Sequence, residues 1–528
     1  MPLTLALHKA RREHPERLAA ICGDRRLSYA ALAAEVAQMA GGLQAIGVRR
    51  GDRVALLAPN TDRFLVSAYA VWSLGAILTP LNCRWSADEL AYALTDSGAG
   101  VLLLDDAFAA LLPALRERSA SAFTVVALGD GGDVPGAPGA HDGGWRYAQL
   151  LTHGAHGEPA EDIYAGGDAP AVLFYTGGTT GRAKGVLLSH AGLFSTTLAS
   201  IVIGERAPGA ICLHALPMFH VGGMAVMLQA MVGQCTQLML PVFDPATFLA
   251  TIERERVTEA ALVPTMIRRV VDHPALRTTD LSSLQRLYYG ASPIDGTLLE
   301  QTIASLPGVG LTQFYGMTET AGIAVALPAW CHSAESRALG RHLAAGLPTP
   351  SMEVRIAGPD GEDLPVGEVG EVWLRGPGVM LVYWNLPEQT AQVLQQGWMR
   401  TGDGGRLDAE GLLHIVDRLK DMIVTGGENV YSTEVENAIL SLPGVAQCAV
   451  LGVPDADWGE RVHAVLVLQP GADVDEARVV AHCKTLIAGY KCPRGVEFRS
   501  ELPVSGAGKL LKYQLREAYW QGRSRRVA

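Results

Sequence analysis

Helical and strand-like patterns of apolar residues alternate through the first part of the chain. Residues 28–48 (SYAALAAEVAQMAGGLQAIGV) place apolar side chains three and four positions apart, which indicates a helix. Residues 52–59 (DRVALLAP) are typical of a buried strand, and residues 86–99 (SADELAYALTDSGA) and 100–105 (GVLLLD) repeat the pair. Such alternation predicts an α/β fold with parallel-type sheets packed with helices.

The character of the sequence changes twice further along. From about Met352 it is rich in short strands and turns, as in residues 367–384 (GEVGEVWLRGPGVMLVYW), which indicates a β-subdomain. After about Lys420, helical and strand patterns form a compact α+β unit of roughly 110 residues, within the usual range for a domain. We therefore expect a large N-terminal domain over residues 1–419 and a small C-terminal domain over residues 420–528.

Composition argues against several classes of protein. The 528 residues are 48% hydrophobic and 18% charged, which fits a globular protein with large cores. A net charge of −11 argues against a nucleic-acid partner. The eight cysteines form no CxxC pair and show no metal-like spacing, and the N-terminus becomes charged too soon for a secretory signal. Both features favour the cytoplasm.

One uncharged stretch, residues 64–83, is long enough for a membrane-spanning helix. Gly75 and Pro80 interrupt it, and serine, threonine and asparagine residues dilute it. A buried helix that ends near Gly75, followed by a strand over residues 76–81 (AILTPL), explains the pattern better. We therefore expect no membrane span here.

The stretch FYTGGTTGRAKGV, residues 174–186, concentrates glycine, threonine and lysine between two apolar runs. A Walker ATP-binding loop ends in Gly-Lys-Ser/Thr and opens directly into a helix. Here Lys184 precedes Gly185, both flanking runs are strand-like, and the next helix starts later, behind Ser189 as its N-cap. The loop is therefore either a phosphate site of another kind or a mobile surface turn.

The chemistry of this loop suits phosphate. Glycines let backbone N–H groups approach an anion closely, while threonine hydroxyls add donors and a lysine adds a positive charge. The residues that would contribute are Thr176, Gly177, Gly178, Thr179, Thr180, Gly181 and Lys184.

Four further stretches occur in the same order as motifs of one enzyme family. They are residues 216–223 (LPMFHVGG), 313–320 (QFYGMTET), 399–436 (MRTGDGGRLDAEGLLHIVDRLKDMIVTGGENVYSTEVE) and 502–516 (LPVSGAGKLLKYQLR). With the Gly/Thr loop they resemble the adenylate-forming superfamily, which comprises acyl- and aryl-CoA synthetases, nonribosomal-peptide adenylation domains and luciferases. The resemblance covers nearly the whole chain. It implies an enzyme that uses ATP to convert a carboxylic acid into an acyl-adenylate.

The resemblance also assigns a nucleotide site. Glu319 would bind Mg²⁺, a hard cation that suits carboxylate and phosphate oxygens, and Thr318 would contact the α-phosphate. Tyr315 would stack on adenine, Asp403 would accept both ribose hydroxyls, and Arg418 would hold the ribose from the other side. The adenine-side residues would also include Gly290, Ala291, Ser292 and Gly316.

The catalytic lysine that the resemblance implies is Lys509, which would reach the α-phosphate and the substrate carboxylate. The residues before it, VSGAG, depart from the usual Thr-Pro-Ser/Thr-Gly form. Lys512 is a nearby competitor, or else a solvated charge on a helix, and the pair Gly508–Lys509 favours Lys509. The Gly/Thr loop departs mildly as well, because Gly177 stands where the family usually has serine.

His220 matches a position beside the acyl pocket of CoA-ligase relatives and would also gate thiol entry; the alternative is a packed or solvated histidine. Residues 216–227 contain no acid that could pair with an α-ammonium group, which argues against an amino acid substrate. The expected pocket is mostly apolar and favours an uncharged acyl or aryl chain. Its residues are His220, Gly222, Gly223, Met224, Met266, Tyr289, Gly316 and Ile323. Arg268 and Arg269 either serve a dicarboxylate or lie on a solvated helix face.

The same small domain carries Lys509 and residues 425–429 (TGGEN). This loop resembles the one that lines the pantetheine tunnel of relatives, through Gly426, Gly427 and Glu428. Relatives use both parts at one active site at different times, by rotating a mobile C-terminal domain about a hinge. The hinge position, two residues after the ribose arginine, is Lys420.

The sequence therefore predicts an AMP-forming acid–CoA ligase with ATP, Mg²⁺ and coenzyme A, acting on a medium-chain fatty acid or an aryl or arylpropenoic acid. A luciferase-like or carrier-loading adenylating enzyme is the alternative with the same fold. An ADP-releasing, kinase-like ATPase and a catalytically silent nucleotide-binding protein are alternatives of another class. Relatives are often dimers, which leaves a homodimer open.

Overall fold

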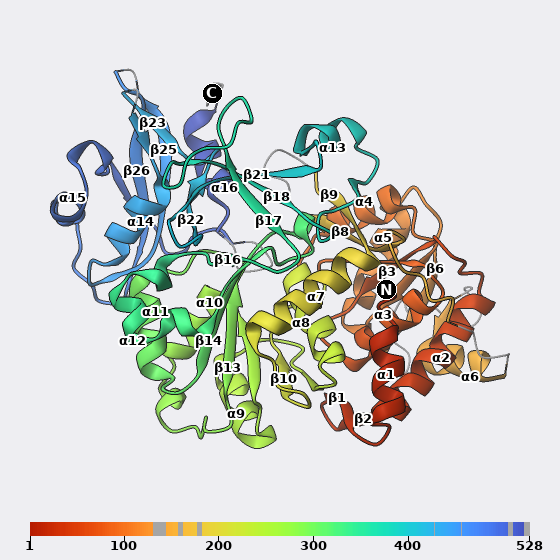
Figure 1. Cartoon of the computed structure of the whole chain (residues 1–528). Helices are drawn as coiled ribbons and strands as arrows, with labels where there is room; N and C mark the ends of the chain where they lie inside the picture. The colour runs from red at the N-terminus through yellow and green to blue at the C-terminus, as the bar shows by residue number, and fades with distance from the viewer. Residues whose placement is uncertain are drawn as a thin grey trace.

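The computed structural model describes residues 1–129, 144–156, 162–176, 182–426, 428–455, 457–504 and 510–521. A large N-terminal part holds two large sheets with helices packed against them (Figure 1). A five-stranded sheet lies beside them, and a smaller α+β part follows at the C-terminal end of the chain. The predicted fold class is confirmed, whereas the exact boundary at Lys420 stays a prediction.

The first large sheet has eight strands in the order β19-β9-β8-β4-β3-β5-β6-β7, and it is parallel from β8 to β7. Its strands are β3 (Arg53–Leu57), β4 (Ile77–Pro80), β5 (Val101–Leu104), β6 (Thr124–Ala127), β7 (Trp145–Arg146), β8 (Pro170–Thr176), β9 (Lys184–Ser189) and β19 (Val382–Tyr383). The helices of this region are α2 (Tyr29–Ala45), α3 (Asp62–Ser73), α4 (Ala87–Ser97), α5 (Leu112–Arg118) and α6 (Tyr147–His156).

Local signals in the sequence place several of these elements correctly. Helix α4 begins with a capping box in which Ser86 and Glu89 bond each other's backbone N–H groups, as this residue pair predicts. Helix α3 is buried along its whole length and is followed by β4, so the uncharged stretch belongs to the core. Within the described ranges, the structure contains no helix both long and apolar enough to cross a membrane.

The second large sheet has nine strands in the order β16-β15-β14-β13-β12-β10-β11-β1-β2 and is parallel from β14 to β1. Its strands are β1 (Leu18–Cys22), β2 (Arg25–Ser28), β10 (Ile211–His214), β11 (Thr236–Met239), β12 (Glu259–Leu262), β13 (Arg286–Gly290), β14 (Gly310–Tyr315), β15 (Val325–Leu327) and β16 (Leu347–Pro348). Its helices are α1 (Leu5–Glu13), α7 (His190–Gly204), α8 (Val221–Val232), α9 (Pro245–Glu255), α10 (Pro264–Val271), α11 (Gly296–Ser305) and α12 (Ala334–Ala338).

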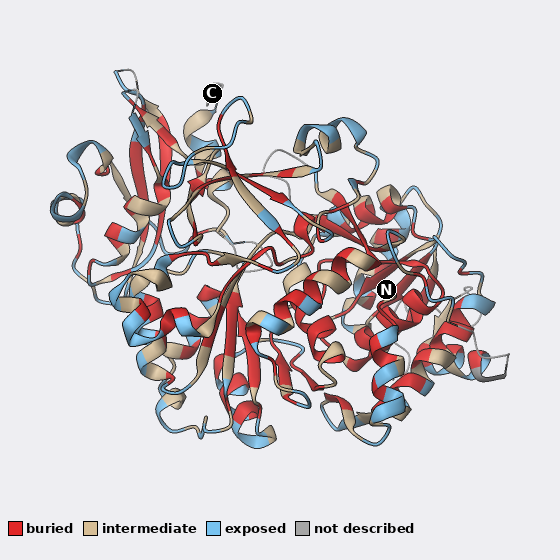
Figure 2. Ribbon diagram, viewed as in Figure 1, coloured by how far each residue is buried: buried red, intermediate tan, exposed pale blue. Residues whose placement is uncertain are grey.

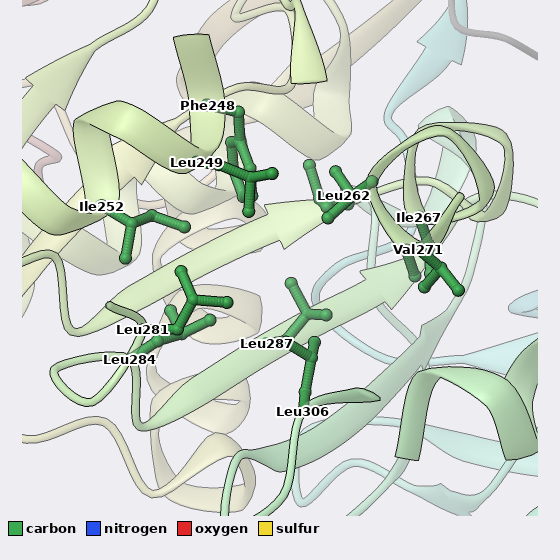
Figure 3. A pocket seen from close by; sticks show the side chains of 11 residues that line it. Phe248, Leu249, Ile252, Leu262, Ile267, Val271, Leu281, Leu284, Leu287 and Leu306 are labelled. Atoms are coloured by element: carbon green, nitrogen blue, oxygen red, sulfur yellow. The ribbon is translucent and has the colours of Figure 1, made fainter. Parts of the chain in front are cut away.

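Different helices pack against the two faces of the nine-stranded sheet. Helices α9, α10 and α11 pack on one face, and α8 packs on the other together with the side chains of Cys212 and Tyr288. Between α9, α10 and the strands lies an apolar cavity of about 10 Å³ lined by leucine, isoleucine, valine and phenylalanine (Figure 3). Ligand pockets measure roughly 300–1,000 Å³, so this cavity is a packing void.

The predicted β-subdomain is a five-stranded antiparallel sheet. Its strands are β17 (Glu353–Ala357), β18 (Gly370–Arg375), β20 (Leu394–Gln395), β21 (Trp398–Leu407) and β22 (Leu413–Arg418), with α13 (Pro387–Val393) alongside. Short 3₁₀ helices join other elements, namely η1 (Asp106–Leu111), η3 (Pro274–Arg277), η4 (Thr318–Thr320), η5 (Ala329–His332), η6 (Arg341–Leu343) and η7 (Gly489–Lys491).

The C-terminal part has its own sheet and its own core, visible as buried strands at the left of Figure 2. Its elements are β23 (Ile423–Thr425), β24 (Glu428–Val430), α14 (Ser432–Leu440), β25 (Val445–Asp455), β26 (Gly459–Leu468), α15 (Glu476–Leu486), β27 (Val496–Phe498) and α16 (Lys512–Trp520). A separate core lets such a unit move as one body.

Candidate functional site

Lys184 and Glu319 contact the same tyrosine, Lys184 at the ring and Glu319 at the hydroxyl. Strand β9 begins at Lys184, and its neighbour β19 contains Tyr383. The Lys184 ammonium lies 5.0 Å from the centre of the Tyr383 ring, and the Tyr383 hydroxyl donates to Glu319 Oε1 at 2.8 Å. Burial and the nearby Glu319 carboxylate raise the pKa of Tyr383, so its hydroxyl stays protonated and donates. The structure thus brings a predicted phosphate ligand beside the predicted metal ligand.

Asp403 is held from two sides by the residues expected around it. It pairs across β21 and β22 with Arg418, whose Nε lies 2.8 Å from Asp403 Oδ1. From the end of β14, the Tyr315 hydroxyl donates to Asp403 Oδ2 at 2.6 Å. The Asp403 carboxylate raises the pKa of Arg418, and the Asp403 residue is only 5% exposed. The three residues therefore form one charge-paired cluster around the buried Asp403, and this cluster joins two sheets.

The predicted adenine side lies where β13 and β14 end next to each other. A Cβ atom on Gly290 would lie 2.2 Å from the carbonyl oxygen of Phe314, and one on Gly316 would lie 2.6 Å from that of Gly322. Only glycine fits either position, and Ala291 follows with a left-handed φ of 66°. Ligands of parallel sheets bind outside such carboxyl ends. Ser292 follows this turn, and Thr318 begins η4 beside Glu319.

Part of the predicted site lies outside the described residues. This applies to Gly177, Gly178, Thr179, Thr180 and Gly181 of the Gly/Thr loop, to Gly427 and to Lys509. The two flanking strands are described: β8 ends at Thr176, which pairs with Lys184 at the start of β9 in antiparallel register. The two strands predicted to flank the Gly/Thr loop are therefore confirmed, and Ser189 caps the following helix by accepting from Gly192 N.

His220 immediately precedes α8, with its ring 4.7 Å from that of Phe219. Burial lowers the pKa of His220 to about 4, so the imidazole is neutral at physiological pH. A Cβ atom on Gly223 would lie 2.1 Å from the carbonyl oxygen of Pro217, whereas one on Gly222 would meet no atom within 4 Å. The first turn of α8 thus folds tightly onto the His220 loop. Met224, in the first turn of α8, and Ile323, in the loop after η4, are both buried.

The remaining predicted pocket residues have contacts on the other face of the nine-stranded sheet. The Tyr289 hydroxyl bonds His332 Nε2 at 2.8 Å, and Met266 packs with the core on the α9–α11 face of the sheet. The preceding residue, Tyr288, points to the opposite face, where it packs with Val226 of α8. Neighbouring residues of a strand point to opposite faces of the sheet, so a shift of one position changes which helices pack against the side chain.

Tyr288 and Phe314 were not expected from the sequence. Their rings stack with centroids 5.8 Å apart on the α8 face, at the ends of the same two strands that lead to Gly290 and Tyr315. The Arg206 guanidinium lies 5.1 Å from the centre of the Tyr288 ring and forms a 2.8 Å ion pair with Glu259. The two tyrosines of "LYYG" carry no local signal that decides which one faces α8.

The predicted coenzyme loop borders an exposed aromatic residue. Gly426 N donates to the carbonyl oxygen of Trp458 at 2.9 Å, and a Cβ atom on Gly426 would lie 2.5 Å from the indole ring. Trp458 is 43% exposed, and the Arg494 guanidinium lies 4.3 Å from its ring centre. Glu428 on the other side of the loop is exposed. An aromatic face with an adjacent cation suits a nucleotide.

Lys420 lies in the short connection between β22 and β23. The backbone N–H groups of Asp421 and Met422 both donate to the carbonyl oxygen of Arg418, at 2.8 and 3.0 Å.

The interpretation of Lys512 as a solvated helix charge is wrong. Its side chain is 14% exposed, and its ammonium bonds Glu436 at 2.7 Å, because α16 packs this face inward.

Comparison with known proteins agrees with this geometry. The family described as AMP-binding enzyme matches residues 7–384, and its C-terminal domain matches residues 434–509. A feruloyl-CoA synthase from Amycolatopsis is 40% identical over 509 residues, covering 96% of this chain and 97% of that protein. An indoleacetate–CoA ligase from Aromatoleum aromaticum is 37% identical over 496 residues, covering 94% and 93%. The ATP-bound structure of MatB from Rhodopseudomonas palustris aligns with a TM-score of 0.86 at 31% identity, covering 98% and 99%.

The chain therefore belongs to the AMP-binding enzyme family, the adenylate-forming superfamily. It is an AMP-forming acid–CoA ligase that uses ATP, CoA and a small-molecule carboxylic acid, as the sequence predicts. The roles of the individual residues stay predictions.

The fit of Gly223 against the His220 loop can be tested directly. Gly223→Ala would place a methyl group 2.1 Å from the Pro217 carbonyl oxygen, so the loop must move. We expect AMP release with the best acid to fall by roughly tenfold or more, because small displacements of positioning groups are costly. Gly100→Ala, where a Cβ meets nothing within 4 Å, is the matched control. Equal activity of the two folded variants would contradict this reading.

Proposed function

We propose that the acid is an aryl or arylpropenoic acid, with a medium-chain fatty acid as the second candidate. The observation that carries this proposal is the partly exposed Phe314, whose ring stacks on the buried Tyr288 on the α8 face beside the nucleotide-side turns. Aromatic rings favour a planar aryl chain through offset or edge contacts. The similarity to a feruloyl-CoA synthase at 40% identity supports the same class of acid.

Charged substrates fit the described residues poorly. The buried Arg206 is already paired with Glu259. Arg268 donates to Gln301 at 2.6 Å and lies 3.8 Å from both Asp272 and Asp295, so it serves no dicarboxylate in this arrangement. A free carboxylate or ammonium at the far end of the acid would therefore lack a counter-charge.

The first half-reaction joins the acid to AMP and releases pyrophosphate. Asp403 and Arg418 would hold the ribose, Tyr315 would lie against adenine, and Lys184 with Thr318 would contact phosphates. Glu319 would hold Mg²⁺, which neutralises phosphate charge when bound. Among the described residues no cluster of three His, Cys, Asp or Glu could hold a metal. Phosphate oxygens would therefore complete the coordination, which is usual for Mg²⁺.

The second half-reaction transfers the acyl group to the CoA thiol. We propose that the C-terminal part, residues 420–528, turns about Lys420 between the two half-reactions. Lys509 then serves adenylation, and the loop at Gly426 and Glu428 serves CoA. His220, being neutral, would border the acyl group and the incoming thiol.

The proposal includes a cytoplasmic location and leaves a homodimer open. All eight cysteines are free in the structure, in keeping with a reducing compartment.

One assay tests the proposal as a whole. The purified chain is incubated with ATP, CoA and a panel of acids (ferulate, coumarate, benzoate, octanoate and malonate), and AMP, ADP and acyl-CoA are quantified. AMP with feruloyl-CoA or coumaroyl-CoA as the best product supports the aryl assignment. A preference for octanoate favours the second candidate, and a preference for malonate overturns both.

The two buried acids provide a test of the nucleotide site. Glu319→Gln and Asp403→Asn should each lower acid-dependent pyrophosphate exchange by about a hundredfold, since both position charge on ATP. Asp408→Asn serves as a control, because Asp408 is a nearby acid paired with His414 at 2.8 Å in a turn of the β-subdomain. Exchange at the wild-type rate in a folded Glu319→Gln or Asp403→Asn variant would remove that residue from the site.

Lys509 should act in the first half-reaction alone. We expect Lys509→Ala to reduce acyl-adenylate formation by about a hundredfold or more, because the transition state loses a charge partner. The same variant should convert ready-made acyl-adenylate and CoA to acyl-CoA at nearly the wild-type rate. A parallel fall of both rates would show that Lys509 has no step-specific role.

Trp458 should act on CoA alone. Stacking of a base on an aromatic ring contributes about 1–3 kcal/mol, so Trp458→Ala should raise the KM for CoA by about tenfold. Pyrophosphate exchange should not change, because it needs no CoA. Trp330→Ala is the matched control: Trp330 is 50% exposed, also lies beside an arginine, Arg341, and belongs to the N-terminal part. An unchanged KM for CoA in Trp458→Ala would exclude this contact.

A further inference from the structure

Helix α16 presents two cations to acids that flank the predicted hinge. Lys512 and Arg516 are four residues apart, so they share one face of the helix. Arg516 Nη2 lies 2.5 Å from Asp421 Oδ1, one residue after Lys420. Lys512 is directed toward Glu436 and Ser432 of α14. The helix that follows the Lys509 segment in the sequence is thus tied to the region around Lys420.

The Lys512 ammonium sits at the centre of a buried polar chain. It lies 2.7 Å from Glu436 Oε1 and donates to Ser432 Oγ at 2.6 Å. The backbone N–H of Ser432, at the start of α14, donates to Asp417 Oδ2, so that Asp417 satisfies an otherwise open N–H of this helix. Lys512 is therefore linked to Asp417 through Ser432.

Asp417 connects this chain to the nucleotide side. Its other oxygen, Oδ1, accepts from the backbone N–H of Arg418 at 2.7 Å. Arg418 is the residue that pairs with Asp403. Ser432 and Lys512 belong to the proposed moving part, whereas Asp417 and Arg418 precede Lys420. The contact between Asp417 and Ser432 therefore crosses the proposed hinge.

The charges favour this arrangement. Burial by itself lowers the pKa of Lys512, but the surrounding carboxylates of Glu436, Asp417 and Asp421 outweigh it and raise the pKa. Lys512 is therefore protonated at neutral pH. Removal of the cation would leave Glu436 and Asp417 buried near each other without their shared counter-charge, which is costly.

We propose that Lys512 is a positioning residue that, through Ser432 and Asp417, fixes the end of β22 and with it Arg418 against the C-terminal part. It touches no reacting atom. Because the bond between Asp417 and Ser432 crosses the proposed hinge, the same chain also favours the domain arrangement of this structure. This inference rests on the two half-reactions of the proposed function and adds a coupling between them.

The test uses the full chain with AMP and, separately, with ferulate, ATP and CoA. Lys512→Met should weaken the binding of AMP, measured by titration calorimetry, by about tenfold, or about 1.4 kcal/mol. It should also change the ratio of pyrophosphate exchange to acyl transfer from feruloyl-adenylate. Lys512→Arg keeps a cation and should restore both values to within about threefold of wild type. Lys484→Met, at an exposed lysine of α15, is the matched control.

Asp417→Asn provides the second variant, because asparagine loses the charge and also one of the two acceptors that bond Ser432 N and Arg418 N. In a double-mutant cycle, Lys512→Met and Asp417→Asn together should weaken AMP binding hardly more than either alone. Should Lys512→Met fail to fold, Asp417→Asn with AMP binding within about threefold of wild type overturns the proposal. Additive effects, or an unchanged ratio of half-reactions in folded Lys512→Met, also overturn it.

The proposal and the proposed function can fail separately. AMP binding does not depend on the identity of the acid, so a protein that binds AMP and ignores ferulate refutes only the aryl assignment. A wild-type chain that performs both half-reactions, with variants that keep its ratio and its AMP affinity, refutes only the role of Lys512.

Discussion

The pairing of Asp403 with Arg418 is the contact on which the rest of the site depends. Asp403 is nearly buried, and a buried carboxylate is tolerated only when it is paired and hydrogen-bonded. Arg418 supplies the charge from the neighbouring strand, and Tyr315 supplies a hydroxyl from the nine-stranded sheet. One carboxylate thereby holds the β-subdomain against the large sheet at the edge where two parallel strands end. The proposed nucleotide site would be positioned by this junction.

A second junction sets the phosphate side. Tyr383 pairs with β9 through the backbone and reaches Glu319 through its hydroxyl, while Lys184 lies over its ring. The three side chains come from segments far apart in the sequence, and none could be placed by its own neighbours. Lys184 contacts the ring of Tyr383 and Glu319 accepts from its hydroxyl, and the two charges form no ion pair with each other. In the proposed site both charges would be available to a phosphate and its cation.

Local patterns predict the elements well and the partners of side chains poorly. The capping box at Ser86 and the strands around the Gly/Thr loop follow from residues within a few positions of each other. The choice between Tyr288 and Tyr289 depends on which face of the sheet α8 covers, and this is a tertiary fact. The sequence leaves Lys512 open as a competitor of Lys509 or a solvated charge, because its partner Ser432 lies 80 positions earlier. Its burial becomes apparent only when α16 is packed.

The connection at Lys420 would reconcile a fixed ribose site at Asp403 and Arg418 with the proposed rotation of the C-terminal part. Strand β22 ends at Arg418 and β23 begins at Ile423, so rotation has only residues 419–422 in which to occur. The carbonyl oxygen of Arg418 accepts from two N–H groups of this segment, and Asp417 accepts from a third N–H beyond it. A few dihedral changes in this segment can exchange these bonds. Because the C-terminal part has its own core, the strain of exchanging these hydrogen bonds would stay within residues 419–422. Asp403 could then keep Arg418 as its partner while the C-terminal part turns.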